Sequence, residues 1–556
     1  MRKTLLSILL VAASLVGANA KVVVVPDSKT VARDSITIFG RVLCEGKPLA
    51  DVPVSDGVHI VKTDSLGRYT MASNKFQNTV FVITPSGYEP VTRKGVEPKF
   101  WALLEKKREV GEQHDFHLVK RDQRNHRILF MSNLFLQNSN DDLLQFKKRT
   151  IPAARNIVKA TKDSTAVYTI LLGDISNCPM WYSHEFDVDD AVSLVTTLRY
   201  PTMVYTVMGD QDNDGAVPGT GLTDYYAERH YVYSCGPKYY SMNIGDVHYV
   251  VLDNTVFRNE PGKGKYPAEI VGKRNYERFV TSDQLDWLRK DLSLIADKEK
   301  PIVVCMHQIV FTANGRGNIS KRLSKPEHVD SLTNCFKEFK NVHFVTSGTM
   351  DRRVSNAKEI PNITEHAVAS TSGDRWRTGY SGYASINSGG VPAGFEIFDV
   401  SNRQISWHHR AENGDTCPFR IYDMSSVGAY YRDNLDIQNL LREYPKTFIN
   451  YDNKEFEKYI YVNWWGFEKG AKLEIFEDNR ALRVRQIHQA DPLVVATSSA
   501  ITLKHSRNKP NMGRNNCQHM FRALRTSLES TIRVRATDPF GNVYEETIAG
   551  TRRFQP

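Results

Sequence analysis

The sequence lacks three features, each of which would have indicated a particular class of protein. There is no Cys-x-x-Cys pair, which argues against a zinc ribbon or a thiol redox motif. After the N-terminal segment no apolar run reaches the length of about 18 residues that a membrane-spanning helix needs. Lys and Arg are dispersed rather than gathered in runs with interleaved aromatics, so no nucleic-acid partner is expected. Internal repeats and low-complexity tracts are also missing.

What is present indicates a globular chain of several domains. The 556 residues exceed what one ordinary core accommodates, and the 41% hydrophobic and 24% charged residues are typical of folded proteins. The formal net charge is +10, from 73 basic and 63 acidic residues. We interpret this balance as a solvated surface, which leaves an anionic ligand or surface as one class of partner.

The first residues predict a signal peptide for export. Arg2 and Lys3 precede an apolar stretch at residues 5–16, and Ala18-Asn19-Ala20 has the small-x-small pattern of a cleavage site. We expect cleavage after Ala20 and a periplasmic or secreted mature chain. The chain has seven cysteines, an odd number, so an exported form would leave at least one thiol outside any internal disulfide. Their pairing and the oligomeric state stay open.

Periodicity divides the remaining chain into three parts. Residues 21–120 alternate apolar and polar positions between Gly-containing turns, as β-strands do, and resemble the β-sandwich of carboxypeptidase regulatory-like domains. Residues 126–412 alternate apolar strands with helical stretches, expected at 141–162, 187–198 and 282–294. Residues 413–556 return to a β-rich pattern.

The central part repeats one sequence pattern, in which a short apolar run ends at a polar residue. These runs occupy residues 127–133, 168–174, 203–212, 301–307 and 342–351. In an open α/β sheet the carboxyl ends of the strands meet loops where ligands bind. We therefore expect one site at which these strand ends converge.

Taken together, the strand ends resemble the calcineurin-like metallophosphoesterase family, and the whole chain resembles secreted bacterial members with a further domain on each side. The family pattern reads D-x-H, G-D, G-N-H-D, a lone H and G-H-x-H. The corresponding segments here are Asn133-Leu-Phe135, Gly173-Asp174, Gly209-Asp-Gln-Asp212, His307 and Gly348-Thr-Met-Asp351. The resemblance implies an α/β fold with a four-layer core, two β-sheets flanked by helices, between two all-β sandwich domains.

In that family the motif residues hold two metal ions, ~3.5–4 Å apart, that polarise a phosphate ester. Here Phe135 has no donor atom and neutral Asn133 is a weak ligand at the first position. The resemblance implies that Asp174, Asp210 and His307, with Asp351 as a further candidate, could hold one divalent cation, Mg, Mn or Ca in preference to zinc. Alternatively no metal binds, Asp210 and Asp212 form a polar turn, and Asp351 pairs with neighbouring arginines.

The residue implied beside the leaving group is also changed. Gln211 stands where the family has a His, next to Asp212. A Gln side chain donates a hydrogen bond but cannot give up a proton at neutral pH, and loss of a general acid typically costs ~10²–10⁴ in rate.

Three functions stay open at this stage. The first is a pseudo-enzyme or strongly impaired phosphoesterase that binds a phosphate ester or an anionic ligand of the cell envelope. The second is an active single-metal hydrolase of phosphate esters. The third is a structural or ligand-binding envelope protein.

Overall fold

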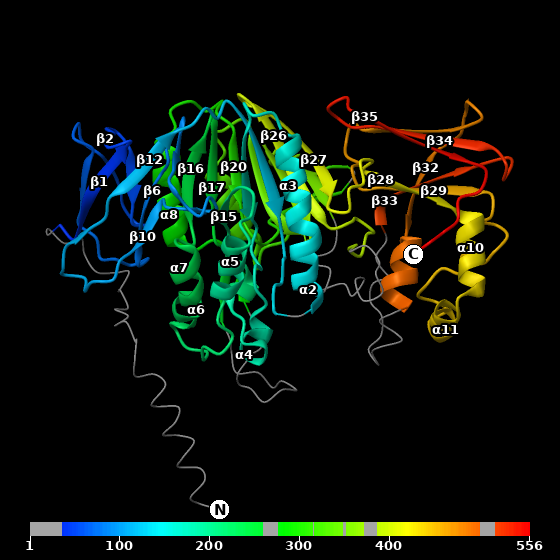
Figure 1. Cartoon of the computed structure of the whole chain (residues 1–556), viewed down its shortest axis with the longest axis horizontal. Coiled ribbons are helices and arrows are strands. Elements are labelled where there is room, and N and C mark those ends of the chain that lie inside the picture. Colours follow the sequence, from blue (N-terminus) through cyan, green and yellow to red (C-terminus); the bar gives the residue numbers. More distant parts are fainter. Residues whose placement is uncertain are drawn as a thin grey trace, which may run out of the picture.

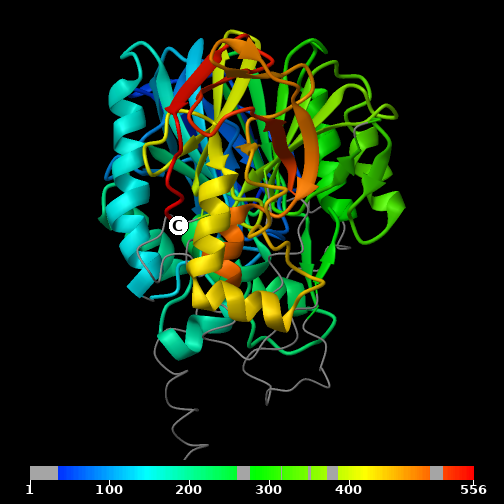
Figure 2. The same cartoon turned by 90° about the vertical axis from the view of Figure 1, so that its right-hand side faces the viewer.

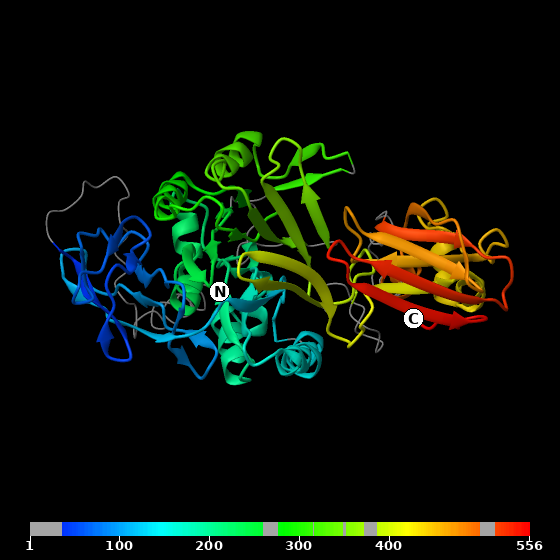
Figure 3. The ribbon, with the colours of Figure 1, turned by 90° about the horizontal axis from the view of Figure 1, so that it is seen from above.

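A computed structural model describes residues 36–138, 140–258, 276–314, 316–348, 352–371, 386–500 and 517–556. Three parts follow one another along the long axis of the molecule (Figures 1 and 3). The N-terminal sandwich lies at one end, the helix-flanked core in the middle and the C-terminal domain at the other end. The order in space therefore repeats the order in sequence.

The core contains two mixed sheets. The first has the order β15-β14-β13-β26-β27, in which β13, β14 and β15 run parallel. The second has the order β16-β17-β20-β23-β25-β24, in which β17, β20, β23 and β25 run parallel. The strands are β13 (Asn125–Met131), β14 (Ala166–Leu171), β15 (Met203–Thr206), β16 (Tyr240–Ile244), β17 (Val247–Val251), β20 (Ile302–Cys305), β23 (Val342–Gly348), β24 (Arg353–Asn356), β25 (Ile363–Ala369), β26 (Gly394–Ser401) and β27 (Gln404–Ala411).

Helices cover the outer faces of this pair of sheets. Ile128 and Ile170 of the first sheet share one buried cluster with Val250 and Val304 of the second, so the inner faces pack together. The helices are α2 (Asn140–Gln145), α3 (Ile151–Ala160), α4 (Trp181–His184), α5 (Val188–Thr197), α6 (Thr223–Ala227), α7 (Arg229–Cys235), α8 (Ser282–Ser293) and α9 (Pro326–Asn334). In the end-on view α3, in cyan, lies on one flank and green helices lie on the other (Figure 2). The predicted four-layer α/β core is confirmed.

The helix expected at 141–162 is present as an unbroken helical run from Asn140 to Ala160. Between α2 and α3 the chain makes a wider π-helical turn at Phe146–Thr150, and Pro152 lies in the first turn of α3. Proline has no N–H to donate, so it is tolerated where a helix begins. The helical run therefore widens by one π-helical turn just before Pro152 and does not end there.

The N-terminal part is a two-sheet sandwich, as its alternation predicted. One sheet has the order β11-β1-β12-β7 with β2 and β5 joined to β1, and the other has the order β10-β6-β3-β4. Its strands are β1 (Ile38–Cys44), β2 (Lys47–Pro48), β3 (Pro53–Ser55), β4 (Ile60–Lys62), β5 (Arg68–Met71), β6 (Thr79–Val82), β7 (Tyr88–Pro90), β10 (Trp101–Leu103), β11 (Glu112–Gln113) and β12 (Phe116–Lys120), with a separate hairpin of β8 (Thr92–Arg93) and β9 (Glu97–Pro98).

This sandwich is packed against the core rather than tethered to it. The indole of Trp287 on α8 donates to Ser55 Oγ at 3.0 Å, and the hydroxyl of Tyr239 donates to the carbonyl of Gly57 at 2.8 Å. Val204 N of β15, the edge strand of the first core sheet, donates to Val96 O at 2.8 Å. The two parts share one hydrophobic cluster.

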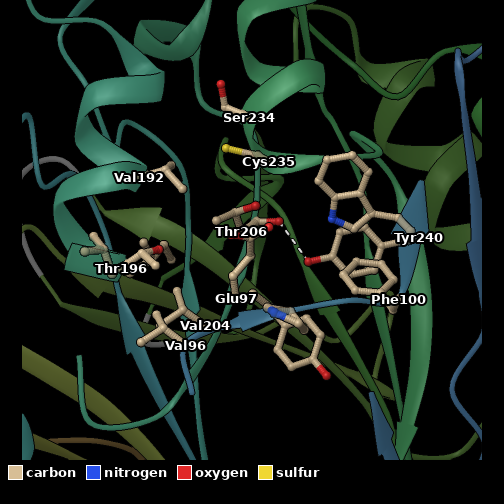
Figure 4. Close-up of a pocket in the computed structure, with 15 residues that line it drawn as sticks. Val96, Glu97, Phe100, Val192, Thr196, Val204, Thr206, Ser234, Cys235 and Tyr240 are labelled. Carbon is tan, nitrogen blue, oxygen red and sulfur yellow. Dashed lines mark hydrogen bonds between the residues drawn. The ribbon is translucent and has the colours of Figure 1, made fainter. Parts of the chain in front are cut away.

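A small cavity lies at this contact, between β15, α5, α7 and the N-terminal part (Figure 4). Its walls are mostly apolar, including Val96, Phe100 and Val204, and the hydroxyl of Tyr240 donates to the carbonyl of Thr206 at 2.9 Å. The cavity volume of about 30 Å³ matches the share of a single water molecule. It has no room for a substrate.

The C-terminal domain contains the expected sheets and also helices that the sequence analysis did not predict. Its sheets have the orders β28-β29-β33-β32 and β31-β30-β34-β35. The strands are β28 (Phe419–Asp423), β29 (Tyr459–Trp464), β30 (Lys472–Glu477), β31 (Arg480–Ala481), β32 (Arg485–Gln489), β33 (Cys517–Leu524), β34 (Thr531–Thr537) and β35 (Val543–Ala549). The helices are α10 (Met424–Asp433), α11 (Leu435–Glu443) and the short α12 (Pro492–Val494).

The seven cysteines all lie in described segments, and no two of them form a disulfide in this structure. Among the described residues there is also no helix whose length and hydrophobicity would let it cross a membrane.

His126 on β13 gives the fold a titratable core position. Its side chain is 1% exposed; Nδ1 donates to the carbonyl of Gln123 at 2.9 Å and Nε2 accepts from the hydroxyl of Tyr249 at 2.7 Å. Burial lowers the pKa of His126 to about 4. The folded imidazole therefore stays neutral at a pH where the unfolded one is already protonated.

Because the folded pKa is depressed, the stability that His126 contributes is complete above pH ~6.5 and is lost as the pH falls towards the folded pKa. We expect the difference in unfolding free energy between wild type and His126→Gln to shift against the wild type by about 2 kcal/mol between pH 7.5 and pH 5. Urea unfolding at both pH values measures it. An equal difference at both pH values would contradict the assignment.

Candidate metal centre

Three of the predicted strand ends meet at one point between the two core sheets. Asp174 follows β14 and Asp210 follows β15, neighbouring parallel strands of the first sheet. His307 follows β20 of the second sheet. The carboxyl ends of strands from both sheets therefore deliver the cluster, as the repeated strand-end pattern predicted.

Two glycines allow this close approach. A Cβ on Gly173 would lie 2.6 Å from His307 Nδ1 and 2.8 Å from Gly209 Cα, and a Cβ on Gly209 would lie 2.2 Å from Asp174 N. Gly173 also has a φ of +83°, which L-side chains rarely adopt. The Gly-Asp pairs are thus a packing requirement, because any larger residue would separate the two carboxylates from the imidazole.

The geometry of the cluster suits a cation. His307 Nε2 lies 3.0 Å from Asp210 Oδ1 and 3.3 Å from Asp174 Oδ1, and one ligand atom from each residue lies within 4.8 Å of the others. His307 Nδ1 donates to the carbonyl of Leu172 at 2.8 Å, which turns Nε2 towards the carboxylates. A backbone acceptor on the far ring nitrogen is the usual arrangement of a metal-ligating histidine.

The electrostatics agree with this interpretation. Burial raises the pKa of Asp174, and the charge of Asp210 raises it further. Burial lowers the pKa of His307, but the two carboxylates outweigh it and hold that pKa well above the usual value. Two acidic groups and a readily protonated imidazole thus share one buried site, and a divalent cation would displace a proton from Nε2 and offset the carboxylates.

Amide side chains complete the surroundings of Asp210. Gln211 Nε2 donates to Asp210 Oδ2 at 2.5 Å, and Gln308 Nε2 donates to Asp210 Oδ1 at 2.9 Å. Gln308 is itself fixed by Asn254 through paired hydrogen bonds of 2.8 Å. Sequence analysis missed Gln308 and Asn254; the position of Gln308 directly after His307 was the available signal.

Gln211 and Asp212 face different surroundings. Gln211 N donates to Asp174 Oδ1 at 2.9 Å, so its backbone and its side chain both touch the cluster. Asp212 accepts from Ser176 N and Gly209 N, each at 3.0 Å, and so holds the loops after β14 and β15 together. Burial and the charge of Asp174 raise the pKa of Asp212 to about 7.

The strand end of β13 differs from the others. Asn133 is fully buried at a φ of +51°, and its Oδ1 accepts from Ser347 Oγ at 2.9 Å. Phe135, 4% exposed, offers only an apolar ring. Thr349 and Asp351, the remaining predicted positions, lie outside the described residues.

A hairpin beyond β17 adds a tyrosine that the sequence analysis did not single out. β18 (Thr255–Phe257) pairs with β19 (Tyr276–Arg278), and the guanidinium of Arg278 lies 5.7 Å from the centre of the Tyr276 ring. Burial raises the pKa of Tyr276, and the charge of Asp210 raises it further. Tyr276 is therefore within electrostatic reach of the cluster.

Two family models match the chain. Residues 36–121 match the N terminal of calcineurin-like phosphoesterase, and residues 365–544 match the C terminal of calcineurin-like phosphoesterase. The second match begins in β25, so it includes the last strands of the core as well as most of the C-terminal domain. No curated protein matches the sequence.

The solved structures that match the chain include two phosphatases. A dimetal phosphatase from Danio rerio is 11% identical, with 52% of this chain and 96% of that chain covered and a TM-score of 0.32. The purple acid phosphatase PPD1 from yellow lupin is 12% identical, with 66% of this chain and 68% of that chain covered and a TM-score of 0.33. Because the identities and TM-scores are this low, no residue of this chain is equated with a residue of either phosphatase. The chain therefore contains segments similar to the N terminal and to the C terminal of calcineurin-like phosphoesterase, and the three-residue cluster lies between them in the sequence.

Proposed function

We propose that this protein is an exported pseudo-enzyme, or strongly impaired phosphoesterase, that holds one divalent cation and binds a phosphate ester or another anionic ligand. The observation that carries this proposal is the asymmetry of the site. Asp174, Asp210 and His307 converge within 4.8 Å, whereas Asn133 Oδ1 is occupied by Ser347 and Phe135 is apolar. The first three residues would hold one of the two cations of a two-cation centre, and Asn133 and Phe135 do not supply ligands for the other.

The retained donor set fits a hard cation. Two carboxylates and one imidazole with a backbone-anchored far nitrogen are ligands suited to Mg, Mn or Ca. A bound ion would act as a Lewis acid on a phosphoryl oxygen. The protein's own amides, Gln211 and Gln308, would keep the Asp210 carboxylate oriented towards it.

Hydrolysis is the function most weakened by this arrangement. The side chain of Gln211 donates to Asp210 and carries no proton that it can release near neutral pH. A leaving alkoxide would find no general acid there, a loss typically of ~10²–10⁴ in rate.

The second candidate is an active single-metal hydrolase. It is favoured by the intact cluster and by the hydrogen bond that Gln211 could still offer to a leaving group. The third, a structural envelope protein, requires that the cluster hold no ion and the site no ligand.

The deciding experiment combines metal analysis with turnover. Protein purified without chelator is expected to contain about one Mn or Mg ion per chain and to hydrolyse phosphomonoesters and phosphodiesters at the background rate. Turnover that Asp174→Ala abolishes would establish the single-metal hydrolase instead. Two ions per chain would contradict the proposal of a single-cation site. If the protein binds neither an ion nor a ligand, the structural envelope protein is the remaining candidate.

A further inference from the structure

Asn133 presents a hydrogen-bond donor that nothing in the described part of the chain uses. The residue is 0% exposed, and its Oδ1 is taken by Ser347 Oγ at 2.9 Å. That bond fixes the amide orientation and leaves Nδ2 as the free end. Nδ2 is buried and has no hydrogen-bond partner among the described residues. A buried donor without an acceptor is costly, so its presence points to an acceptor from outside the chain.

The backbone ties this donor to the metal centre. Asn133 N donates to Gly173 O at 3.2 Å, and Phe135 N donates to Asp174 O at 3.0 Å. Asn133 and Asp174 both have φ near +50°, a region in which Asn and Asp are tolerated better than most side chains. The segment after β13 and the segment after β14 therefore lie against each other, and Asn133 is held in place beside Asp174.

The charges of the cluster indicate which acceptor belongs there. Without a cation, the acidic side chains of Asp174 and Asp210 disfavour an anion beside them. A divalent ion held by these residues would offset the carboxylates and attract an anion to the centre beside which Asn133 lies. An N–H···O⁻ bond is stronger than a neutral one.

We propose that Asn133 Nδ2 is the donor of an oxyanion subsite, and that it binds a phosphate oxygen of a ligand held by the cation. The inference rests on the proposed single-cation site and adds what recognises the ligand there. Asn133 is then a ligand-binding residue, and Ser347 is the positioning residue that fixes its amide orientation.

The test is calorimetric titration of the full chain, loaded with one equivalent of Mn²⁺, with inorganic phosphate. Asn133→Gly tolerates the positive φ and removes the amide, and Asn133→Asp keeps the shape and removes the donor. Both are expected to weaken phosphate binding roughly ten- to hundredfold, the loss typical of one hydrogen bond to a charged group. Ser347→Ala keeps Nδ2 and is expected to lose less than either.

The manganese content and the thermal midpoint are measured on the same samples. They distinguish a failure of the proposed single-cation site from a failure of the oxyanion subsite. If the wild type binds no Mn²⁺, the proposed function fails. If the wild type binds Mn²⁺ but not phosphate, or if both folded Asn133 variants bind phosphate like the wild type, the oxyanion subsite is wrong. Phosphate binding of equal strength without Mn²⁺ would also overturn it, since the cation is required to balance the carboxylates.

Discussion

Replacing Arg352 with methionine is expected to destabilise the protein by about 3–5 kcal/mol, because it removes the only cation from a buried ion triad in the described structure. Arg352 donates to both oxygens of Glu396 on β26, at 2.7 and 2.6 Å, and to Glu468 of the C-terminal domain at 2.9 Å. It also donates to the carbonyl of Trp465 at 3.1 Å. The triad joins the core to the C-terminal domain.

Without the guanidinium, two carboxylates would face each other in a site from which water is excluded. Burial already raises the pKa of Glu468 even with Arg352 in place. We expect Arg352→Lys to lose less, because it keeps the charge but not the paired hydrogen bonds. Adding Glu396→Gln and Glu468→Gln to Arg352→Met should restore part of the stability, since no uncompensated charge remains. Calorimetric unfolding measures all of these variants. A loss below 1 kcal/mol in Arg352→Met would show that the triad does not hold the domains together.

The second large effect is on cation binding. Asp174→Asn is expected to abolish the stabilisation that Mn²⁺ gives the protein, about 2.7 kcal/mol at a hundredfold excess over Kd. Asp174 is 2% exposed and lies 3.3 Å from His307 Nε2. An Asn side chain keeps the shape and can still accept from Gln211 N, so the loop after β14 should stay folded.

In the absence of metal the same variant should be at least as stable as the wild type. Burial and the charge of Asp210 both oppose the ionised form of Asp174, so a neutral amide relieves a cost that His307 and the Gln211 N–H offset only in part. The matched control is Asp246→Asn, at an exposed turn between β16 and β17, which should leave the Mn²⁺ effect unchanged. Thermal unfolding with and without Mn²⁺ measures both variants. An undiminished shift in Asp174→Asn would remove this residue from the cation site.

Local patterns were sufficient for many elements of the fold, but not for all of them. Alternating positions predicted the strands of the N-terminal sandwich, and apolar runs followed by Gly-Asp predicted strand ends that do meet at Asp174 and Asp210. The helices α10 and α11 were missed although local signals exist. Asp423 and Asn434 are their N-caps, each accepting a hydrogen bond from a backbone N–H of the first turn. The strands on either side of these helices alternate apolar and polar residues strongly, and this alternation led to a β-rich prediction for the whole segment.

The sequence by itself determined where the carboxylates and the imidazole would be placed, because a strand that ends in Gly-Asp or in His fixes its side chain within a few residues. Only the tertiary structure decided what surrounds them. Gln308 reaches Asp210, Ser347 reaches Asn133, and Glu468 reaches Arg352 across separations of 98, 214 and 116 positions. Such partners depend on how the two core sheets and the C-terminal domain pack together. Hydrogen bonds between segments that are distant in sequence produce no periodic pattern from which they could be predicted.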